Sequence, residues 1–190
     1  MEDETRLKEY LALHPQPTLN ILVLGTPGSG KRSVCSRLAI DVFPVDHDPT
    51  ENGQYRRPIQ LFPPEQGHVL LNWTTILADA AEINHGMLQQ MVREADAFML
   101  VYRTSDRGTF DGIASLWQHH IAGKVEGPGF VVANGGGDDV ISPRDGQATA
   151  DSLGAAFWQL SAKTGHGAAE KQLVAMARTI LLQRLQSVAE

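Results

Sequence analysis

Residues 19–31 read LNILVLGTPGSGK, and this stretch decides the fold. The residues before the first glycine are almost all apolar, which predicts a buried strand. A glycine-rich loop follows, and residues 33–40 behind it have the spacing of a helix. A strand that turns through such a loop into a helix is typical of folds in which strands and helices alternate.

The alternation continues outward from this unit along the chain. It predicts an α/β fold with an open, mostly parallel sheet that is covered by helices on both faces. Further strands are expected at residues 59–62, 69–77, 97–102, 130–133 and 157–160. Further helices are expected at residues 4–13, 87–94, 110–117, 144–153 and 168–185.

The glycine-rich loop matches G-x-x-x-x-G-K, the pattern of the P-loop. Its glycines let backbone N–H groups turn inward around phosphate oxygens, and the following helix adds the positive end of its dipole. We therefore expect Gly25, Gly28, Ser29, Gly30 and Lys31 to bind a nucleotide phosphate. The alternative is a strand-to-helix turn without a ligand, which the lysine and its context disfavour.

The motif departs from its usual form at the next position. A Ser or Thr hydroxyl normally ligates magnesium there, whereas this chain has Arg32. Ser33 comes one residue later, about 100° around the helix. The Arg32 guanidinium either lies near the phosphates and replaces part of the cation's charge, or it extends into solvent. Both residues are candidate nucleotide contacts.

From residue 25 to residue 55 the sequence aligns with Ras without a gap, and the chain resembles Ras-family small GTPases. The resemblance implies that Phe43 packs against the guanine and that Pro44 and Val45 contact the ribose. It also implies that Thr50, in the tripeptide Asp-Pro-Thr, closes over magnesium and the γ-phosphate.

The resemblance extends over roughly residues 18–185. Near its end, Ser161-Ala162-Lys163 looks like the guanine-binding S-A-K motif of the family, placed after a strand. By resemblance, the backbone N–H of Ala162 contacts the guanine oxygen and the stem of Lys163 lies along the base.

Residues 78–83, which read ADAAEI, depart from the family's second phosphate motif, D-x-x-G followed by a catalytic Gln. Asp79 remains as the metal-side carboxylate, so the metal ligands implied by the resemblance are Thr50 and Asp79. The glycine that grips the γ-phosphate is either replaced by Glu82, whose charge would repel that phosphate, or deleted. Ile83 replaces the Gln that orients the attacking water. We expect GTP hydrolysis to be very slow or absent, and a requirement for Mg²⁺ is doubtful.

The guanine-specificity motif N-K-x-D is also eroded, because residues 134–139 read NGGGDD. Asn134 is in place, but Gly137 stands where the family has the Asp, and Asp138 follows one residue late. Glycines tolerate unusual backbone angles, so Asp138 could swing in to reach the guanine. The alternative is a flexible loop without base contact.

Composition narrows the function classes. The formal net charge of −6 argues against a nucleic-acid binder. A single cysteine, Cys35, excludes an internal disulfide, and a cytoplasmic address is expected. No apolar run is long enough to predict a membrane span, and residues 186–190 contain no C-a-a-X lipidation box.

The sequence thus predicts an N-terminal amphipathic extension at residues 1–17 that docks on the domain or on another protein. It predicts a Ras-like P-loop domain at residues 18–187, with a six-stranded mixed sheet. The leading hypothesis is a GTP- or GDP-binding protein that acts through effector, regulator or complex-subunit proteins in signalling or trafficking. The alternative is a pseudo-GTPase, an interaction module that binds no nucleotide.

Overall fold

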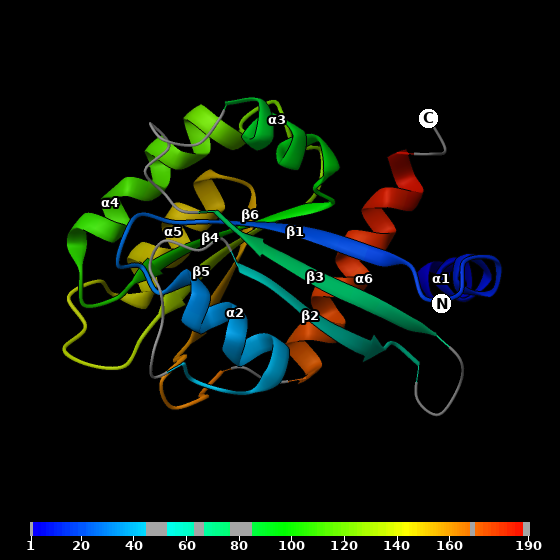
Figure 1. The fold of residues 1–190 in the computed structure, drawn as a ribbon, viewed down its shortest axis with the longest axis horizontal. Helices are drawn as coiled ribbons and strands as arrows, with labels where there is room; N and C mark the ends of the chain where they lie inside the picture. Colours follow the sequence, from blue (N-terminus) through cyan, green and yellow to red (C-terminus); the bar gives the residue numbers. More distant parts are fainter. Residues whose placement is uncertain (1, 45–52, 63–66, 77–84, 168–169, 188–190) are drawn as a thin grey trace.

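The computed structural model describes residues 2–44, 53–62, 67–76, 85–167 and 170–187 (Figure 1). Its strands form one six-stranded sheet in the order β2-β3-β1-β4-β5-β6. Strand β2 runs antiparallel to β3, and all other neighbours are parallel. The strands are β1 (Thr18–Leu24), β2 (Gly53–Gln60), β3 (His68–Thr75), β4 (Ala97–Arg103), β5 (Gly129–Asn134) and β6 (Ala155–Leu160). The predicted α/β fold is confirmed.

Each strand except β2 is followed by a helix, and one helix precedes β1. They are α1 (Glu2–Leu13), α2 (Lys31–Ile40), α3 (His85–Glu94), α4 (Arg107–Leu116), α5 (Pro143–Ser152) and α6 (Glu170–Ser187). Helix α4 runs on into a π-helical turn, η1 (Trp117–Ile121), which the sequence did not predict. No helix in these described ranges is both long and apolar enough to cross a bilayer.

Strand β2 differs most from its prediction, since it spans Gly53–Gln60 rather than residues 59–62. Every second residue of β2 as far as Pro58 is exposed to solvent, including Gln54 and Arg56. A strand at the edge of the sheet with one open face carries few apolar residues. A search for apolar runs therefore found only its buried end around Ile59.

The sheet separates two apolar clusters, one on each face. In β1, Leu19, Ile21 and Val23 belong to one cluster, whereas Leu22 and Leu24 belong to the other. This alternation explains why β1 is apolar along nearly its whole length. The first cluster includes residues of α1, α2 and α6, and the second includes residues of α3, α4 and α5. In Figure 1, α3 and α4 lie above the sheet and α2 lies below it.

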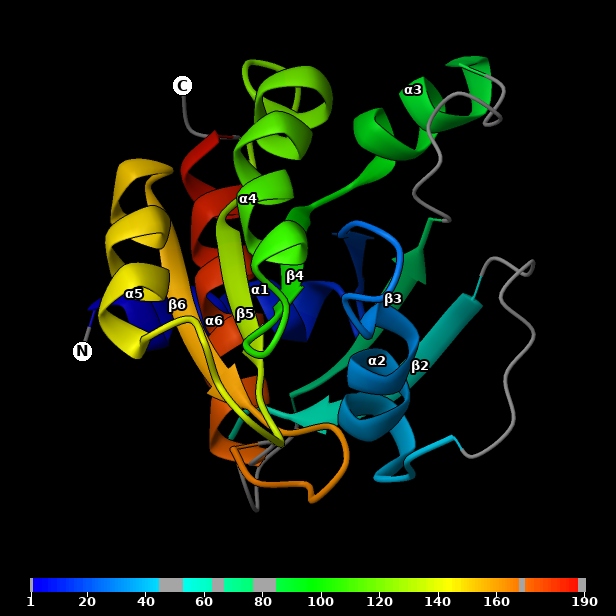
Figure 2. The same ribbon diagram turned by 90° about the vertical axis from the view of Figure 1, so that its left-hand side faces the viewer.

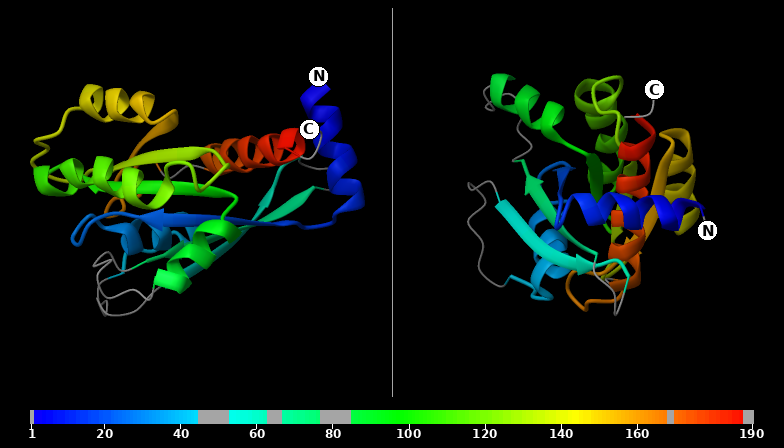
Figure 3. Two further views of the ribbon diagram at one scale, coloured as in Figure 1. Left: turned by 90° about the horizontal axis from the view of Figure 1, so that it is seen from above. Right: turned by 90° about the vertical axis from the view of Figure 1, so that its right-hand side faces the viewer.

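The N-terminal extension forms α1, which crosses α6 at the end of the molecule far from α2 (Figure 3). Its Leu7 and Leu11 are buried in the first cluster, and burial of each contributes about 1.5–3 kcal/mol. Pro15 and Pro17 prevent the helix from continuing into β1. The extension thus docks on the domain, while its boundary at residue 17 stays a prediction.

Candidate functional site

The glycine-rich loop joins β1 to α2 at the end of the sheet seen in Figure 2. Gly30 caps α2 with φ +84°, a left-handed conformation that favours glycine. A Cβ at Gly30 would also lie 2.3 Å from Nδ2 of Asn134, and one at Gly25 would lie 2.5 Å from the backbone oxygen of Val101. Glycine is thus favoured at position 30 by its positive φ and at position 25 by its close approach to the backbone of Val101.

Lys31 begins α2 and is buried, with 9% of its surface exposed. Its Nζ donates to the backbone oxygen of Gly25 at 2.6 Å and to that of Thr26 at 3.1 Å. The loop therefore curls around the ammonium group. A full positive charge stands at the helix N-terminus, an arrangement suited to phosphate.

Hydroxyl groups of the loop add polar atoms that the described residues leave unsatisfied. Ser29 is fully buried, yet its Oγ has no hydrogen-bond partner among the described residues. The Oγ1 of Thr26 is also buried and likewise has no partner among them. A buried hydroxyl without a partner costs free energy. The loop thus fits an anionic oxygen ligand such as a nucleotide phosphate.

Arg32 is half-buried, and its Nε and Nη1 are shielded from solvent without a hydrogen-bond partner in the described part of the chain. This disfavours the alternative in which the side chain extends into solvent. A guanidinium is a donor only and cannot ligate a cation. Arg32 therefore does not fit the magnesium ion that the usual hydroxyl would hold. Ser33, the next residue, is half-buried.

Thr75 is a buried polar residue near the phosphate loop that the sequence analysis did not single out. It ends β3 opposite Val23, next to the loop, and is 2% exposed. Its Oγ1 accepts from the backbone N–H of Gly53 at 3.0 Å and lies 3.2 Å from the backbone oxygen of Gly53. The hydroxyl at this strand end is thus engaged with β2. A Thr in an apolar strand gives no sequence signal for this role.

Asn134 joins the phosphate loop to the S-A-K loop. Its Nδ2 donates to the backbone oxygen of Ser29 at 3.4 Å, and its Oδ1 accepts from the backbone N–H of Ala162 at 3.1 Å. The structure therefore brings together residues that the sequence separates by more than a hundred positions. The Ala162 N–H, which the resemblance assigned to the guanine oxygen, here donates to Asn134.

The S-A-K loop is held by its own turn and by α2. Ser161 Oγ accepts from the N–H of Thr164 at 3.3 Å, and Lys163 is exposed. Arg37 of α2 donates from Nε to the backbone oxygen of Ala162 at 2.8 Å and from Nη2 to that of Lys163 at 3.3 Å. Sequence reasoning missed Arg37, because a lone arginine in an amphipathic helix resembles a solvated residue.

The glycine-rich loop after β5 places its two acids differently. Both acids are exposed, but Asp139 also accepts a hydrogen bond from Oγ1 of Thr104, a residue that follows β4. The backbone oxygen of Thr104 also accepts from the N–H groups of Val140 and Ile141 at 2.9 and 3.0 Å. The loop is therefore fastened to Thr104 rather than loose.

The remaining candidates lie in and after the segment that follows α2. Phe43 is 38% exposed and Pro44 is half-buried, so the Phe43 ring is accessible for stacking. Val45, Thr50 and Asp79 lie outside the described residues, so their predicted ribose and metal roles stay predictions. Across the described ranges, no group of three or more His, Cys, Asp or Glu residues could hold a metal ion.

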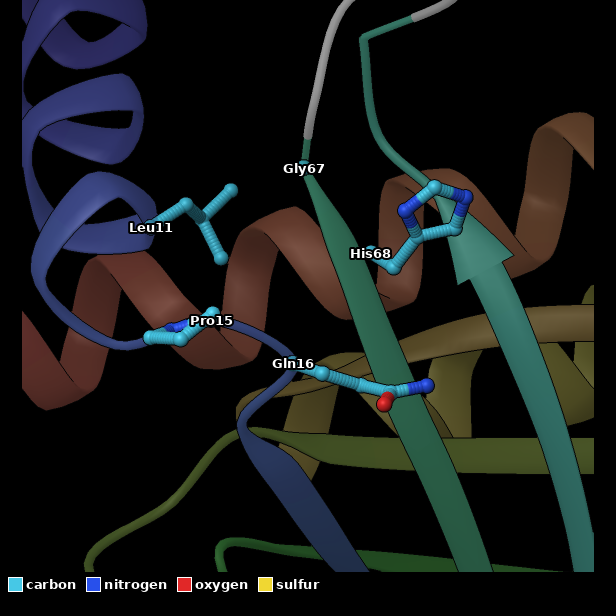
Figure 4. A pocket seen from close by; sticks show the side chains of 5 residues that line it. All are labelled: Leu11, Pro15, Gln16, Gly67 and His68. Carbon is cyan, nitrogen blue, oxygen red and sulfur yellow. The ribbon is translucent and has the colours of Figure 1, made fainter.

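A separate hollow of about 390 Å³ lies at the opposite end of β1 (Figure 4). It opens between the segment that links α1 to β1 and the β2–β3 hairpin. It is lined by Leu11, Pro15, Gln16, Gly67 and His68. Because β1 separates the two ends by roughly 20 Å, this hollow has no part in the phosphate loop.

Comparison with known proteins agrees with the fold and the phosphate loop. Residues 20–182 match the profile of the Ras family. The Ras-like protein rasC of Dictyostelium discoideum is 26% identical over 77% of this chain and 78% of its own length. Protein ras-1 of Neurospora crassa is 28% identical over 77% of this chain and 68% of its own length. The human Ras-related and estrogen-regulated growth inhibitor is 25% identical over 88% of this chain and 83% of its own length.

These matches span most of the domain and include the loop that holds Lys31, the bridging Asn134 and the S-A-K turn. They support a GTP-binding protein of the signalling class, in which binding partners are effectors and regulators. The chain belongs to the Ras family.

Proposed function

We propose that this chain binds a guanine nucleotide, acts through protein partners and hydrolyses GTP very slowly or not at all. The observation that carries the proposal is the loop around Lys31, a buried ammonium beside the unsatisfied hydroxyl of Ser29. Asn134 ties this loop to Ala162, so that phosphate and base contacts belong to one site.

Slow hydrolysis follows from the chemistry of the missing groups. Catalysis in this fold depends on a positioned water and on neutralised charge at the transferring phosphoryl group. Arg32 replaces the metal-ligating hydroxyl, and Glu82 and Ile83 replace the gripping glycine and the water-orienting Gln. Pro27, where Ras has Gly, adds bulk to the loop. We expect single-turnover phosphate release below about 10⁻⁴ per second.

Nucleotide affinity should depend little on magnesium. The shielded Arg32 guanidinium supplies positive charge near the helix N-terminus, where Mg²⁺ would otherwise neutralise phosphate. Affinity measured in EDTA and in millimolar Mg²⁺ should therefore agree within a few-fold. A large loss on chelation would contradict this part of the proposal.

Partners belong to the same proposal, with effectors, regulators or subunits of a complex as their class. Work in signalling or trafficking within the cytoplasm is the expected context, on the strength of the family and the single cysteine. The relatives are named for Ras-like proteins and a growth inhibitor, and this chain would act in the same general way.

The direct test is the nucleotide content of the purified full chain. Denaturing the protein and separating the supernatant by anion exchange should release GDP or GTP. Titration of the emptied protein with labelled GDP then measures the affinity. Neither bound nucleotide nor titratable binding is the result that would overturn the proposal.

A second candidate is an interaction module that binds no nucleotide. One observation favours it: the backbone oxygens of Gly25 and Thr26 already accept hydrogen bonds from Lys31. The clasp between Arg37 and the S-A-K loop likewise needs no ligand. An empty supernatant together with a folded, stable protein would select this candidate.

A further inference from the structure

Helix α4 approaches the phosphate loop at Gly112, a glycine in the interior of the helix. A Cβ added at Gly112 would lie 2.4 Å from Cγ2 of Thr26, a separation that real side chains do not adopt. Thr26 is half-buried, and its Oγ1 is shielded from solvent without a hydrogen-bond partner in the described ranges. The Thr26 side chain is thus seated directly against the backbone of α4.

The backbone of Thr26 holds the phosphate loop together. Its carbonyl oxygen accepts from Nζ of Lys31 at 3.1 Å and from the backbone N–H of Ser29 at 3.2 Å. The preceding carbonyl oxygen, that of Gly25, accepts from the same Nζ at 2.6 Å. A shift of Thr26 therefore moves the acceptors that place the Lys31 ammonium.

Helix α4 is fixed firmly at its start. Its N-cap, Asp106, accepts a hydrogen bond from the N–H of Gly108 at 2.9 Å. Thr109 is 2% exposed, and its Oγ1 accepts from the backbone N–H of Arg103 at 2.9 Å. Ile113 is fully buried in the core. A larger side chain on the loop-facing side of α4 must therefore displace the loop rather than the helix.

Glycine in the interior of a helix lowers stability relative to alanine. Glycine at position 112 thus costs helix stability but permits the close approach to Thr26. We propose that Gly112 is a positioning residue for the phosphate loop, which sets the place of Thr26 and, through Thr26, that of the Lys31 ammonium. This inference rests on the proposed nucleotide binding and deepens it, because it makes α4 a wall of that site.

Two substitutions isolate the contact. Gly112→Ala adds a methyl group there, and because the side-chain rotation of a β-branched Thr26 is restricted, the strain passes to the loop backbone. Thr26→Ser removes Cγ2. The Thr26 Cβ and Oγ1 lie 3.7 and 3.9 Å from the position of the added methyl group, which are ordinary van der Waals distances. The double variant therefore restores the fit and is the matched control.

The experiment is titration of the full chain and of these three variants with GDP and with GMP. Gly112→Ala should weaken GDP binding by about tenfold or more, and GMP binding less, because the loop lysine reaches the outer phosphate that GMP lacks. Thr26→Ser and the double variant should bind GDP within about threefold of the wild type. Helix propensity alone predicts that Gly112→Ala raises stability and leaves affinity unchanged.

Unchanged GDP affinity in Gly112→Ala would overturn the inference, as would a loss of affinity that persists in the double variant. An equal loss for GDP and GMP would also overturn it, because the effect would then be a general disturbance of the fold.

Urea unfolding of the nucleotide-free proteins tests the contact separately from binding. Gly112→Ala should shift the urea midpoint more favourably in the Thr26→Ser background than in the wild type, since the two residues touch. Additive midpoints would overturn the inference. Non-additive midpoints without any binding of GDP would support the contact and contradict the proposed function instead.

Discussion

Two parts of the site differ in how far they keep the features of the Ras family. We call the loop around Lys31 the phosphate end, and the loop after β5, residues 135–141, the base end. At the phosphate end, Gly25, Gly30 and Lys31 have the close approaches and the buried charge that phosphate binding requires. At the base end, three glycines precede two acids, and Asp139 is bonded to Thr104. The phosphate end thus keeps the backbone geometry that its glycines set, whereas the base end has lost the side chains that the family uses to bind guanine. If the proposed nucleotide binding holds, phosphate affinity and base selectivity should therefore be separable.

Removal of the phosphate-end charge should have the largest effect. Lys31→Met keeps the length of the side chain and removes its ammonium. Hydrogen bonds from a charged donor contribute about 1.5–3 kcal/mol, so affinity for GDP should fall by about 10- to 150-fold in titrations. Lys171→Met, which removes an exposed lysine of α6, is the control and should bind as the wild type does. Equal affinity in both variants would show that the loop does not hold phosphate.

The second-largest effect is expected at Asn134, which connects the phosphate loop to the S-A-K loop. Asn134→Ala removes the bonds to the oxygen of Ser29 and to the N–H of Ala162, so both loops lose a partner. We expect GDP affinity to fall about tenfold and stability to fall by about 1–2 kcal/mol in urea unfolding. Asn72→Ala breaks a comparable bond to Asn20 and should lower stability alone. Loss of binding in both variants would mean that the effect is global.

The hydrogen bond between Thr104 and Asp139 should affect stability rather than nucleotide binding. Thr104→Val keeps the shape of the side chain and removes the hydroxyl bonded to Asp139. The exposed carboxylate of Asp139 stays hydrated, so loss of this hydrogen bond should cost only about 0.5–1.5 kcal/mol in denaturant unfolding. GDP affinity should change less than threefold. A large loss of affinity would assign Asp139 a role in nucleotide binding.

The smallest effect on stability is expected from a change at Tyr102. The Tyr102 hydroxyl is buried without a partner in the described part of the chain, so Tyr102→Phe should change stability at pH 7 by less than about 0.5 kcal/mol. Because the folded pKa is raised from 10.0 to about 12, the unfolded chain loses this proton first. Wild-type stability should therefore fall between pH 10 and 12, and Tyr102→Phe should show a shallower fall. Parallel chemical unfolding series at pH 9, 10 and 11 would check this.

The contrast between the two ends also explains what could be predicted from sequence. Apolar runs such as residues 97–102 and 130–133 correspond to buried strands, because both faces of the central sheet are covered. The edge strand β2 was missed over Gly53–Pro58 because its open face is polar. At the phosphate end, glycine spacing fixes the backbone, so the predicted residues lie together.

Other contacts depend on the tertiary structure. Thr75, Thr104 and Arg37 have roles set by partners 22, 35 and 125 positions away, respectively, and none belongs to a recognisable motif. The choice between Asp138 and Asp139 likewise depends on how the loop is fastened. Sequence spacing places both acids near Asn134 but does not reveal which of them bonds to Thr104.

The central claim is that nucleotide is held mainly through its phosphates. The measurement that tests it most directly is calorimetric titration of the emptied full chain with GDP and with GMP, which lacks the phosphate that the P-loop lysine reaches. The account predicts that GMP binds at least about tenfold more weakly than GDP, because the Lys31 contact is lost. Equal affinities for GDP and GMP, or no binding of GDP at all, would contradict it.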